Sequence, residues 1–233
     1  MSESSSKNFN HLKIHTQYSI CEGAIKIDDL QDFSKSNKIQ SLALCDTSNL
    51  CGALEFAEKI SKAGTQPIIG TQINFKYADT IGLLPLFALN EEGYKRIIKL
   101  SSLSYLENDE LSDPHINFEE LLEDNEGVAL FSGTIFGLFG NLFDKGKFSE
   151  IHDLYRKIKS NYNDRFYLEI QRHKDQNEIG FEKFNLKKSL ELEIPIIATH
   201  EVFYIDKDMH EAHDALICIG NKTYVNEKNR IKL

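Results

Sequence analysis

The 233-residue sequence predicts an α/β fold in which seven strands form a closed or nearly closed barrel. Three observations support this prediction. Short apolar segments alternate, for the most part, with amphipathic helical segments, which is the pattern of parallel βαβ units. Polar residues follow nearly every apolar segment, as they do at the carboxyl ends of barrel strands. The first strand is followed by no Gly-x-Gly-x-x-Gly motif, so a dinucleotide-binding fold is disfavoured.

The expected strands are short runs of apolar or alternating residues. They are placed at 11–15, 40–45, 67–75, 83–89, 128–131, 165–171 and 195–199. Only about seven residues join the third strand to the fourth. That connection is too short for a crossover helix, so it predicts a break in the parallel pattern.

The expected helices follow from apolar residues at three- and four-residue steps. They are placed at 28–37, at 50–63, from residue 90 to about 103, and at 117–123, 135–143, 146–160, 178–191 and 207–219. Asn49 and Asn90 are the expected caps of the second and third helices, because an asparagine side chain accepts hydrogen bonds from free backbone N–H groups.

The balance of charges argues against direct binding of duplex DNA. The chain carries 36 acidic and 27 basic residues, whereas affinity from phosphate neutralisation needs a basic surface. No apolar run approaches the ~18 to 20 residues that cross a bilayer. The polar start also lacks the apolar core of a secretory signal. The four cysteines show no paired short spacing, which predicts reduced thiols and a cytoplasmic location.

The alternating segment from His11 to His15 is the most informative stretch of the sequence. Residues two apart on a strand share a face, so two histidines at such positions can bind one metal ion. Here the pair is Lys13 and His15, and a lysine ammonium has no free lone pair for a metal. The segment is therefore either a strand that never bound metal or a metal-binding strand that has lost a ligand.

Polar side chains collect where the expected strands end, which is where α/β barrels carry their chemistry. They are His15, Asp46, Thr47, Gln72, Ser132 to Thr134, Gln171 to His173, His200 and Glu201. A simpler interpretation is that loops are polar in any protein and that loop histidines bond backbone carbonyls. His210 and His213 stand one residue too close for the H-E-x-x-H zinc motif, which favours a capping or surface role.

Several blocks of sequence, in order, resemble one family. They are 11–19, 42–46 with 49–50, 67–70, 92–94, 167–173 and 212–214. From about residue 9 to 230 the chain resembles the PHP (polymerase and histidinol phosphatase) domain of the bacterial DNA polymerase III alpha subunit. The resemblance implies a distorted seven-stranded (β/α) TIM-like barrel. It also implies a tail at 1–8, the PHP domain at 9–220 and, at 221–233, the start of a linker to a polymerase core. The polar ending, 226–233, carries no closing element, which predicts that a longer protein continues there.

Members of this family with an intact site use nine ligands for a trinuclear metal cluster. By motif position, these ligands would fall on Lys13, His15, Glu22, Thr47, Gln72, Thr134, His173, Glu201 and Phe203. His15 and His173 keep the residue type that the family pattern has. Glu22 and Glu201 stand where the pattern has aspartate, which keeps a carboxylate at each position.

The other five positions have lost their ligands. The family pattern has histidine where this chain has Lys13, Thr47 and Phe203. It has glutamate at Gln72, and cysteine or histidine at Thr134. Lys13 would place a cation where a metal cation would lie, and the two repel each other. Neutral oxygens of threonine and glutamine bind divalent ions weakly. The resemblance therefore predicts a degenerate, metal-free site.

We expect Lys13 to form a charged hydrogen bond with a carboxylate of this vestigial site. The candidates are Asp46, Glu22 and Glu201. The ammonium would then replace the metal as a structural tie.

The resemblance implies a scaffold for DNA replication without catalytic residues or cofactors of its own. Such a domain docks the proofreading exonuclease subunit and braces the polymerase core of the same chain. DNA and Mg²⁺ would be bound only by the full-length parent, a DNA-directed DNA polymerase, and no membrane is involved.

Two alternatives remain open. One is a metal-dependent phosphoesterase or 3′–5′ exonuclease, with His15, Glu22, Asp46, His173 and Glu201 as its ligands. The other is a stand-alone protein similar to histidinol phosphatase, which the blocks at 171–173 and 212–214 disfavour because they are of polymerase type.

Overall fold

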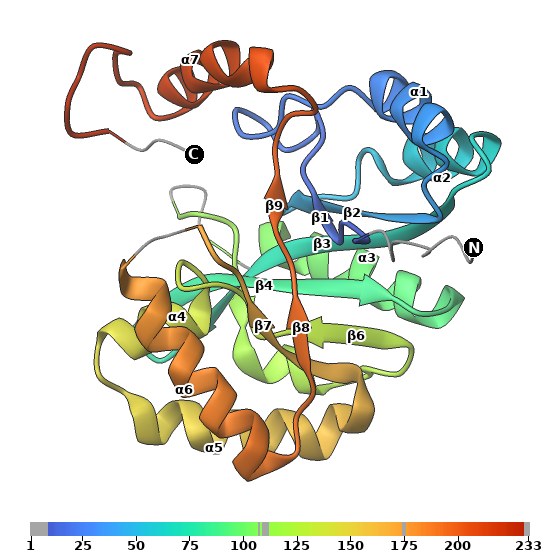
Figure 1. The fold of residues 1–233 in the computed structure, drawn as a ribbon. Helices are drawn as coiled ribbons and strands as arrows, with labels where there is room; N and C mark the ends of the chain where they lie inside the picture. Colours follow the sequence, from blue (N-terminus) through green and yellow to red (C-terminus); the bar gives the residue numbers. More distant parts are fainter. Residues whose placement is uncertain (1–8, 107, 109–111, 174–175, 231–233) are drawn as a thin grey trace, which may run out of the picture.

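A computed structural model describes residues 9–106, 108, 112–173 and 176–230, and the tail expected at 1–8 lies outside them. The strands are β1 (Lys13–Ile14), β2 (Ser41–Thr47), β3 (Gln66–Tyr77), β4 (Thr80–Ala88), β5 (Ile116–Asn117), β6 (Val128–Phe131), β7 (Phe166–Ile170), β8 (Ile196–Ala198) and β9 (Glu201–Val202). They form one curled, nine-stranded sheet in the order β8-β7-β6-β4-β3-β2-β1-β9, with β5 paired to β3 beside this path (Figure 1).

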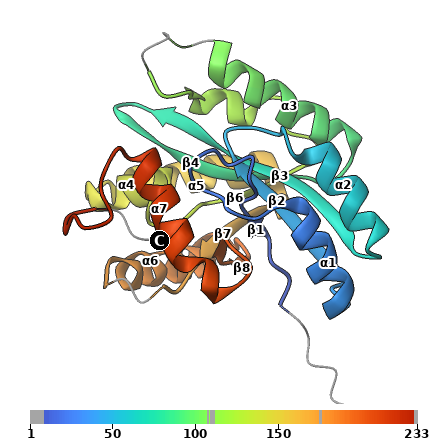
Figure 2. The same ribbon diagram turned by 90° about the horizontal axis from the view of Figure 1, so that it is seen from above.

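The helices cover the outer side of the curled sheet, except the last one, drawn in red, which lies over one end of the sheet (Figure 2). They are α1 (Ile27–Asn37), α2 (Ala53–Lys62), α3 (Glu91–Leu106), α4 (Leu138–Asp144), α5 (Phe148–Tyr162), α6 (Gln176–Leu192) and α7 (His210–Gly220), with 3-10 turns η1 (Phe118–Leu122), η2 (Asn163–Arg165) and η3 (Lys207–Met209). The α/β fold and its barrel-like curl agree with the sequence prediction.

Each expected strand and helix has a counterpart, but the count of seven strands is two too low. The additional strands are β5 and β9, each two residues long. A strand of two residues is too short to show a periodic pattern, so its sequence carries no signal. The expected break in the parallel pattern is confirmed, because β4 runs antiparallel to both β3 and β6.

One of the two expected helix caps is confirmed and the other is wrong. The backbone N–H of Gly93 donates to Oδ1 of Asn90, 2.9 Å away, at the start of α3. The side chain of Asn49 does not cap α2, which begins after Gly52. Its amide donates instead to the backbone carbonyls of Tyr18 and Thr47, and so ties a loop of the candidate site to the end of β2.

Apolar side chains form separate clusters on the two faces of the sheet. On β2, Leu42 and Leu44 belong to the cluster beneath α1 and α2. Ala43 and Cys45, at the alternate positions, belong to a smaller cluster on the inner face. The largest cluster lies between the sheet and helices α3 to α6, where burying each large side chain contributes roughly 1.5–3 kcal/mol.

The two edges of the sheet are successive parts of the chain. β8 is the last strand at one edge and β9 at the other, and only Thr199 and His200 separate them. We call residues 196–202 the seam. In Figure 1 the seam runs as one ribbon across the front of the sheet. It is held by three residue pairs with β7 and two with β1, and so connects the two edges of the sheet.

Candidate functional site

The strand ends border one cavity of about 1520 Å³. Eight of the residues predicted for the vestigial site line it: Lys13, Glu22, Thr47, Gln72, Thr134, His173, Glu201 and Phe203. The other two, His15 and Asp46, are fully buried. The curled sheet therefore gathers most of the predicted set around one space.

Lys13 on β1 is only 1% exposed, and its ammonium lies between two carboxylates. Nζ donates a hydrogen bond to Oε1 of Glu201, the residue paired with Lys13 on β9, and lies 3.5 Å from Oε1 of Glu169 on β7. Burial alone would lower the pKa of Lys13, but these carboxylates outweigh it and raise the pKa above its usual value. The expected charged hydrogen bond is confirmed, with Glu201 as its partner.

Glu201 is bonded on both of its carboxylate oxygens. Oε1 accepts from Lys13, and Oε2 accepts from Nε2 of His15. Burial would raise the pKa of Glu201, but the charges of Lys13 and His15 lower it well below its usual value. The side chain is therefore an anion shared by two groups of the first strand and its loop.

Glu169 and Thr199 belong to this network, but the sequence analysis did not single them out. Oε1 of Glu169 accepts from the hydroxyl of Thr199 and from Nε2 of Gln171, the latter at 3.0 Å. A signal was present, since Phe166 and Leu168 share one face of the strand and Glu169 must lie on the other. Glu169 is 2% exposed, so it points into the half-barrel.

Asp46, at the end of β2, was another candidate partner of Lys13. Its carboxylate bonds the loop after β1 and not the ammonium of Lys13. Its carboxylate accepts from the backbone N–H of Thr16 at 2.6 Å, from the hydroxyl of Thr16 at 2.7 Å and from the hydroxyl of Ser19 at 2.7 Å. The same loop folds tightly around Gly23, where a Cβ would lie 2.1 Å from the carbonyl oxygen of Thr16. This packing fixes the position of the neighbouring Glu22.

Glu22, Thr47 and Gln72 form a separate chain of hydrogen bonds. The hydroxyl of Thr47 donates to Oε2 of Glu22 at 2.5 Å, and Nε2 of Gln72 donates to the hydroxyl of Thr47 at 2.9 Å. The three side chains satisfy one another's hydrogen bonding. The carboxylate of Glu22 therefore already has a neutral donor, the hydroxyl of Thr47.

Phe203 fills space between two histidines. Its ring stacks on His15 at 4.7 Å between centroids, and on His213 at 5.5 Å. Nε2 of His213 donates to the backbone carbonyl of Glu22 at 2.8 Å, while His210 makes an edge contact with Tyr204. The expected capping or surface role is confirmed for the exposed His210. It is wrong for His213, which is 1% exposed and ties α7 to the loop at Glu22.

His173 lies at the other side of the cavity and is also held by a carboxylate. Its Nδ1 donates to Oε1 of Glu178 at 2.7 Å, and its ring stacks on His200 at 4.6 Å. Burial, and then the neighbouring His173, lower the pKa of His200. Thr134 lines the same cavity, and its hydroxyl accepts from the backbone N–H of Phe136 at 3.2 Å.

The donors around the cavity do not fit a metal cluster. Across the described ranges, no group of three or more His, Cys, Asp or Glu side chains is arranged to hold an ion. The Nε2 of His15 is engaged by Glu201, and a lysine ammonium lies against that same carboxylate. What the arrangement does chemically is to neutralise buried carboxylates with a side-chain cation.

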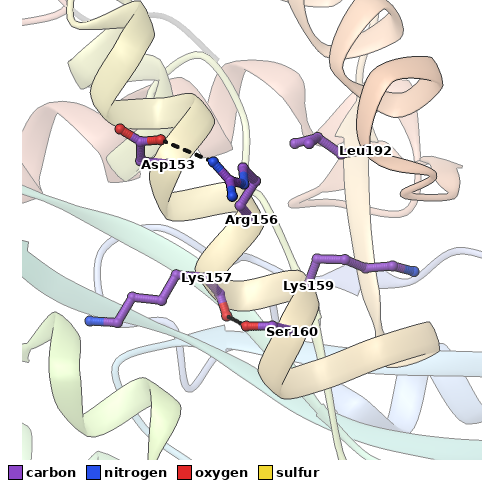
Figure 3. Close-up of a pocket in the computed structure, with 6 residues that line it drawn as sticks. All are labelled: Asp153, Arg156, Lys157, Lys159, Ser160 and Leu192. Carbon is purple, nitrogen blue, oxygen red and sulfur yellow. Dashed lines mark hydrogen bonds and ion pairs between the residues drawn. The ribbon is translucent and has the colours of Figure 1, made fainter.

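A second, smaller cavity of about 550 Å³ lies along the outer side of α5 (Figure 3). Its lining residues are Asp153, Arg156, Lys157, Lys159, Ser160 and Leu192. Figure 3 shows Lys157 and Lys159 extending in opposite directions, so their charges do not converge. Arg156 lies 3.9 Å from Asp153 of the preceding turn. This cavity has the features of a solvated helix face.

The chain matches the family model described as "PHP domain" over residues 11–173. It is 38% identical over 224 residues to the protein named DNA polymerase III subunit alpha of Rickettsia conorii, an alignment that covers 94% of this chain and 19% of that protein. It is 34% identical to the Caulobacter vibrioides protein of the same name, with 99% and 21% covered. The chain thus spans about a fifth of the length of these relatives.

Solved structures of remote sequence share the fold. An amidohydrolase from Chromobacterium violaceum superposes with a TM-score of 0.54 at 10% identity, covering 90% of this chain and 97% of that one. A two-domain protein from Bacteroides vulgatus, described as containing a predicted PHP-like metal-dependent phosphoesterase, gives 0.54 at 14% identity, covering 83% and 51%. Within the described residues, no helix is long and apolar enough to span a membrane.

Proposed function

The chain belongs to the PHP domain family, and from this premise we propose that it is the N-terminal scaffold domain of a bacterial replicative DNA polymerase. In this role residues 9–220 form the PHP domain and 221–233 begin the connection to a polymerase core. The whole polymerase would bind DNA and Mg²⁺ in the cytoplasm. The part described here would contribute contacts and no chemistry.

The observation that carries the proposal is the state of the strand-end cavity. Lys13 stands beside Glu201 and Glu169 as a buried cation, and a divalent ion at that place would repel it. Phe203 fills a ligand position with an aromatic ring stacked on His15. Both features support a site without metal. Neither disturbs the strands and helices around the cavity.

Metal content and hydrolysis test the absence of chemistry. Protein purified without a metal-binding tag is expected to carry substoichiometric zinc, manganese and iron by elemental analysis. Bis-p-nitrophenyl phosphate with added Mn²⁺ is expected to hydrolyse no faster with the wild-type chain than with His15→Ala. Stoichiometric metal, or hydrolysis abolished by His15→Ala, would favour a metal-dependent phosphoesterase or 3′–5′ exonuclease.

Binding tests the scaffold role. The chain is expected to co-elute with the purified proofreading exonuclease subunit of the same bacterium in size-exclusion chromatography, and to extend no primer by itself. Two variants, Phe136→Glu and Leu190→Glu, compare two faces of the domain in this binding test. Each replaces an exposed apolar side chain with a charge: Phe136 is 71% exposed at the cavity, and Leu190 is 85% exposed on α6. Separate elution of wild type and subunit at micromolar concentrations would contradict the docking proposal.

A further inference from the structure

We infer that the ammonium of Lys13 is the cation on which the closure of the half-barrel depends, with Glu169 and Glu201 as its two anchors. The inference rests on the metal-free site proposed above. It assigns a role to Glu169, which is not among the predicted ligand positions. It also explains why the charged side chain of Lys13 is fully buried on the first strand.

The three charged groups come from the three strands that meet at the seam. Lys13 is on β1, next to the edge strand β9 that carries Glu201, and Glu169 is on β7, next to the other edge strand β8. The backbone contributes little here, since β1 and β9 share only two residue pairs. One ammonium therefore joins side chains from both flanks of the seam.

The charges make this ammonium necessary. The side chain of Glu169 is 0% exposed and that of Glu201 is 17% exposed, so two carboxylates lie in a poorly solvated space. Oε2 of Glu169 is buried without a hydrogen-bond partner among the described residues. Two buried anions repel each other unless a cation lies between them. Without Lys13, Glu201 would keep the imidazole of His15 and the neutral amide of Gln171, which donates to Oε1 of Glu201 at 3.3 Å.

The inner face of the sheet leaves room for the lysine chain. The cluster on that face includes Ala43 and Cys45 of β2, which are both small and both fully buried. Ile14 pairs with Leu44 where β1 meets β2, and Leu44 belongs to the cluster on the other face, so Lys13 shares the inner face with Ala43 and Cys45. The site is thus shaped for a side-chain cation as well as charged for one.

Thermal unfolding of matched variants tests the inference. Lys13→Met keeps the length of the side chain without its charge and is expected to lower Tm by roughly 10 °C, because a buried pair loses one partner. Lys95→Met removes an exposed lysine beside Glu91 and Glu92 on α3 and is expected to change Tm by about 2 °C or less. The variant Lys13→Met/Glu201→Gln removes both charges and is expected to lose less than the sum of the two single changes.

Hydrogen exchange separates a tie at the seam from a general loss of stability. In Lys13→Met, the amides of His15 and Thr199, which donate to Val202 and Ile170, are expected to exchange faster, while those of the β3–β4 hairpin stay protected. Uniformly faster exchange throughout the chain would overturn the proposed role of Lys13 at the seam. So would a Tm shift of the double variant equal to the sum of the shifts of the two single variants. If Lys13→Met does not fold, recovery in the double variant supports the tie and its absence overturns it.

Chelation keeps the two proposals distinguishable. The Tm of the wild-type chain is expected to be unchanged by excess EDTA. A fall in the wild-type Tm on chelation would overturn the metal-free site, whereas additive shifts in a chain that is insensitive to EDTA would overturn only the role of Lys13.

Discussion

The β3–β4 hairpin and the seam close the same sheet by different means. The hairpin strands share eight residue pairs, and side chains such as Phe75 and Leu84 bury fully against the helices. β1 and β9 share only two pairs, and at this place the buried side chains are charged. Strands joined by a short turn form a long ladder, which here extends from Tyr77 back to Gly70 on β3. Strands that meet only when the half-barrel closes have a short ladder, and side-chain interactions supplement it.

The largest effect is expected on the apolar side of this comparison. Phe75→Ala should lower the free energy of unfolding by about 3–5 kcal/mol, because it leaves a cavity in the main core. Urea unfolding followed by circular dichroism would measure it. Ile81 on β4 of the same hairpin is 38% exposed, so Ile81→Ala is the matched control and should cost clearly less. Equal losses of unfolding free energy in the two variants would show that burial of side chains does not determine the stability of the hairpin.

A smaller loss is expected where the first loop meets β2. Asp46→Asn should cost about 1.5–3 kcal/mol, because the carboxylate accepts three hydrogen bonds and the new amide group cannot accept them all. Asp79→Asn, in the exposed turn of the β3–β4 hairpin, is the control. A loss for Asp46→Asn no greater than that of the control in the same urea experiment would contradict the importance of this bonding.

The charged network predicts a particular dependence of stability on pH. The pKa of Glu201 is held below its usual 4.5, so its contribution is present above that pH and is lost as the pH falls further. The pKa of Lys13 is raised, so its contribution is complete below about 10.5 and is lost as the pH rises beyond it. Tm measured from pH 3 to pH 11 should therefore fall at both ends. Glu201→Gln should flatten the acid side, and an unchanged acid side would contradict the assignment.

The smallest effect is expected for an ion pair at the surface. Arg172 donates to both carboxylate oxygens of Glu182, but its side chain is 77% exposed. Arg172→Ala should therefore lower the free energy of unfolding, measured with urea, by less than any of the changes above. The comparison between exposed and buried charges would fail if this loss matched that of Lys13→Met.

The periodicity of apolar residues was sufficient to predict the helices and the longer strands, because each contains enough buried and exposed residues to show a period of about 3.6 or 2. It could not reveal β9, since the two residues of β9 are a strand only by virtue of pairing with β1, far away in the sequence. The candidate site was assembled from strand ends and a family resemblance, which put Lys13 and Glu201 in one set, and the structure has these two side chains in contact at the cavity. Glu169 was missed although strand alternation placed it on the face opposite Phe166 and Leu168, because the alternation alone does not show that Lys13 would lie on that side.

The seam has a further consequence for how this domain behaves in a crowded cell. An open sheet normally presents two free edges that can recruit strands from other molecules. Here the outermost strands are three and two residues long and directly consecutive in the chain, so each offers very little unpaired backbone. A foreign strand that displaced one of them would pull on the other. The domain is thereby protected against edge-to-edge aggregation by the way its chain returns to its own beginning.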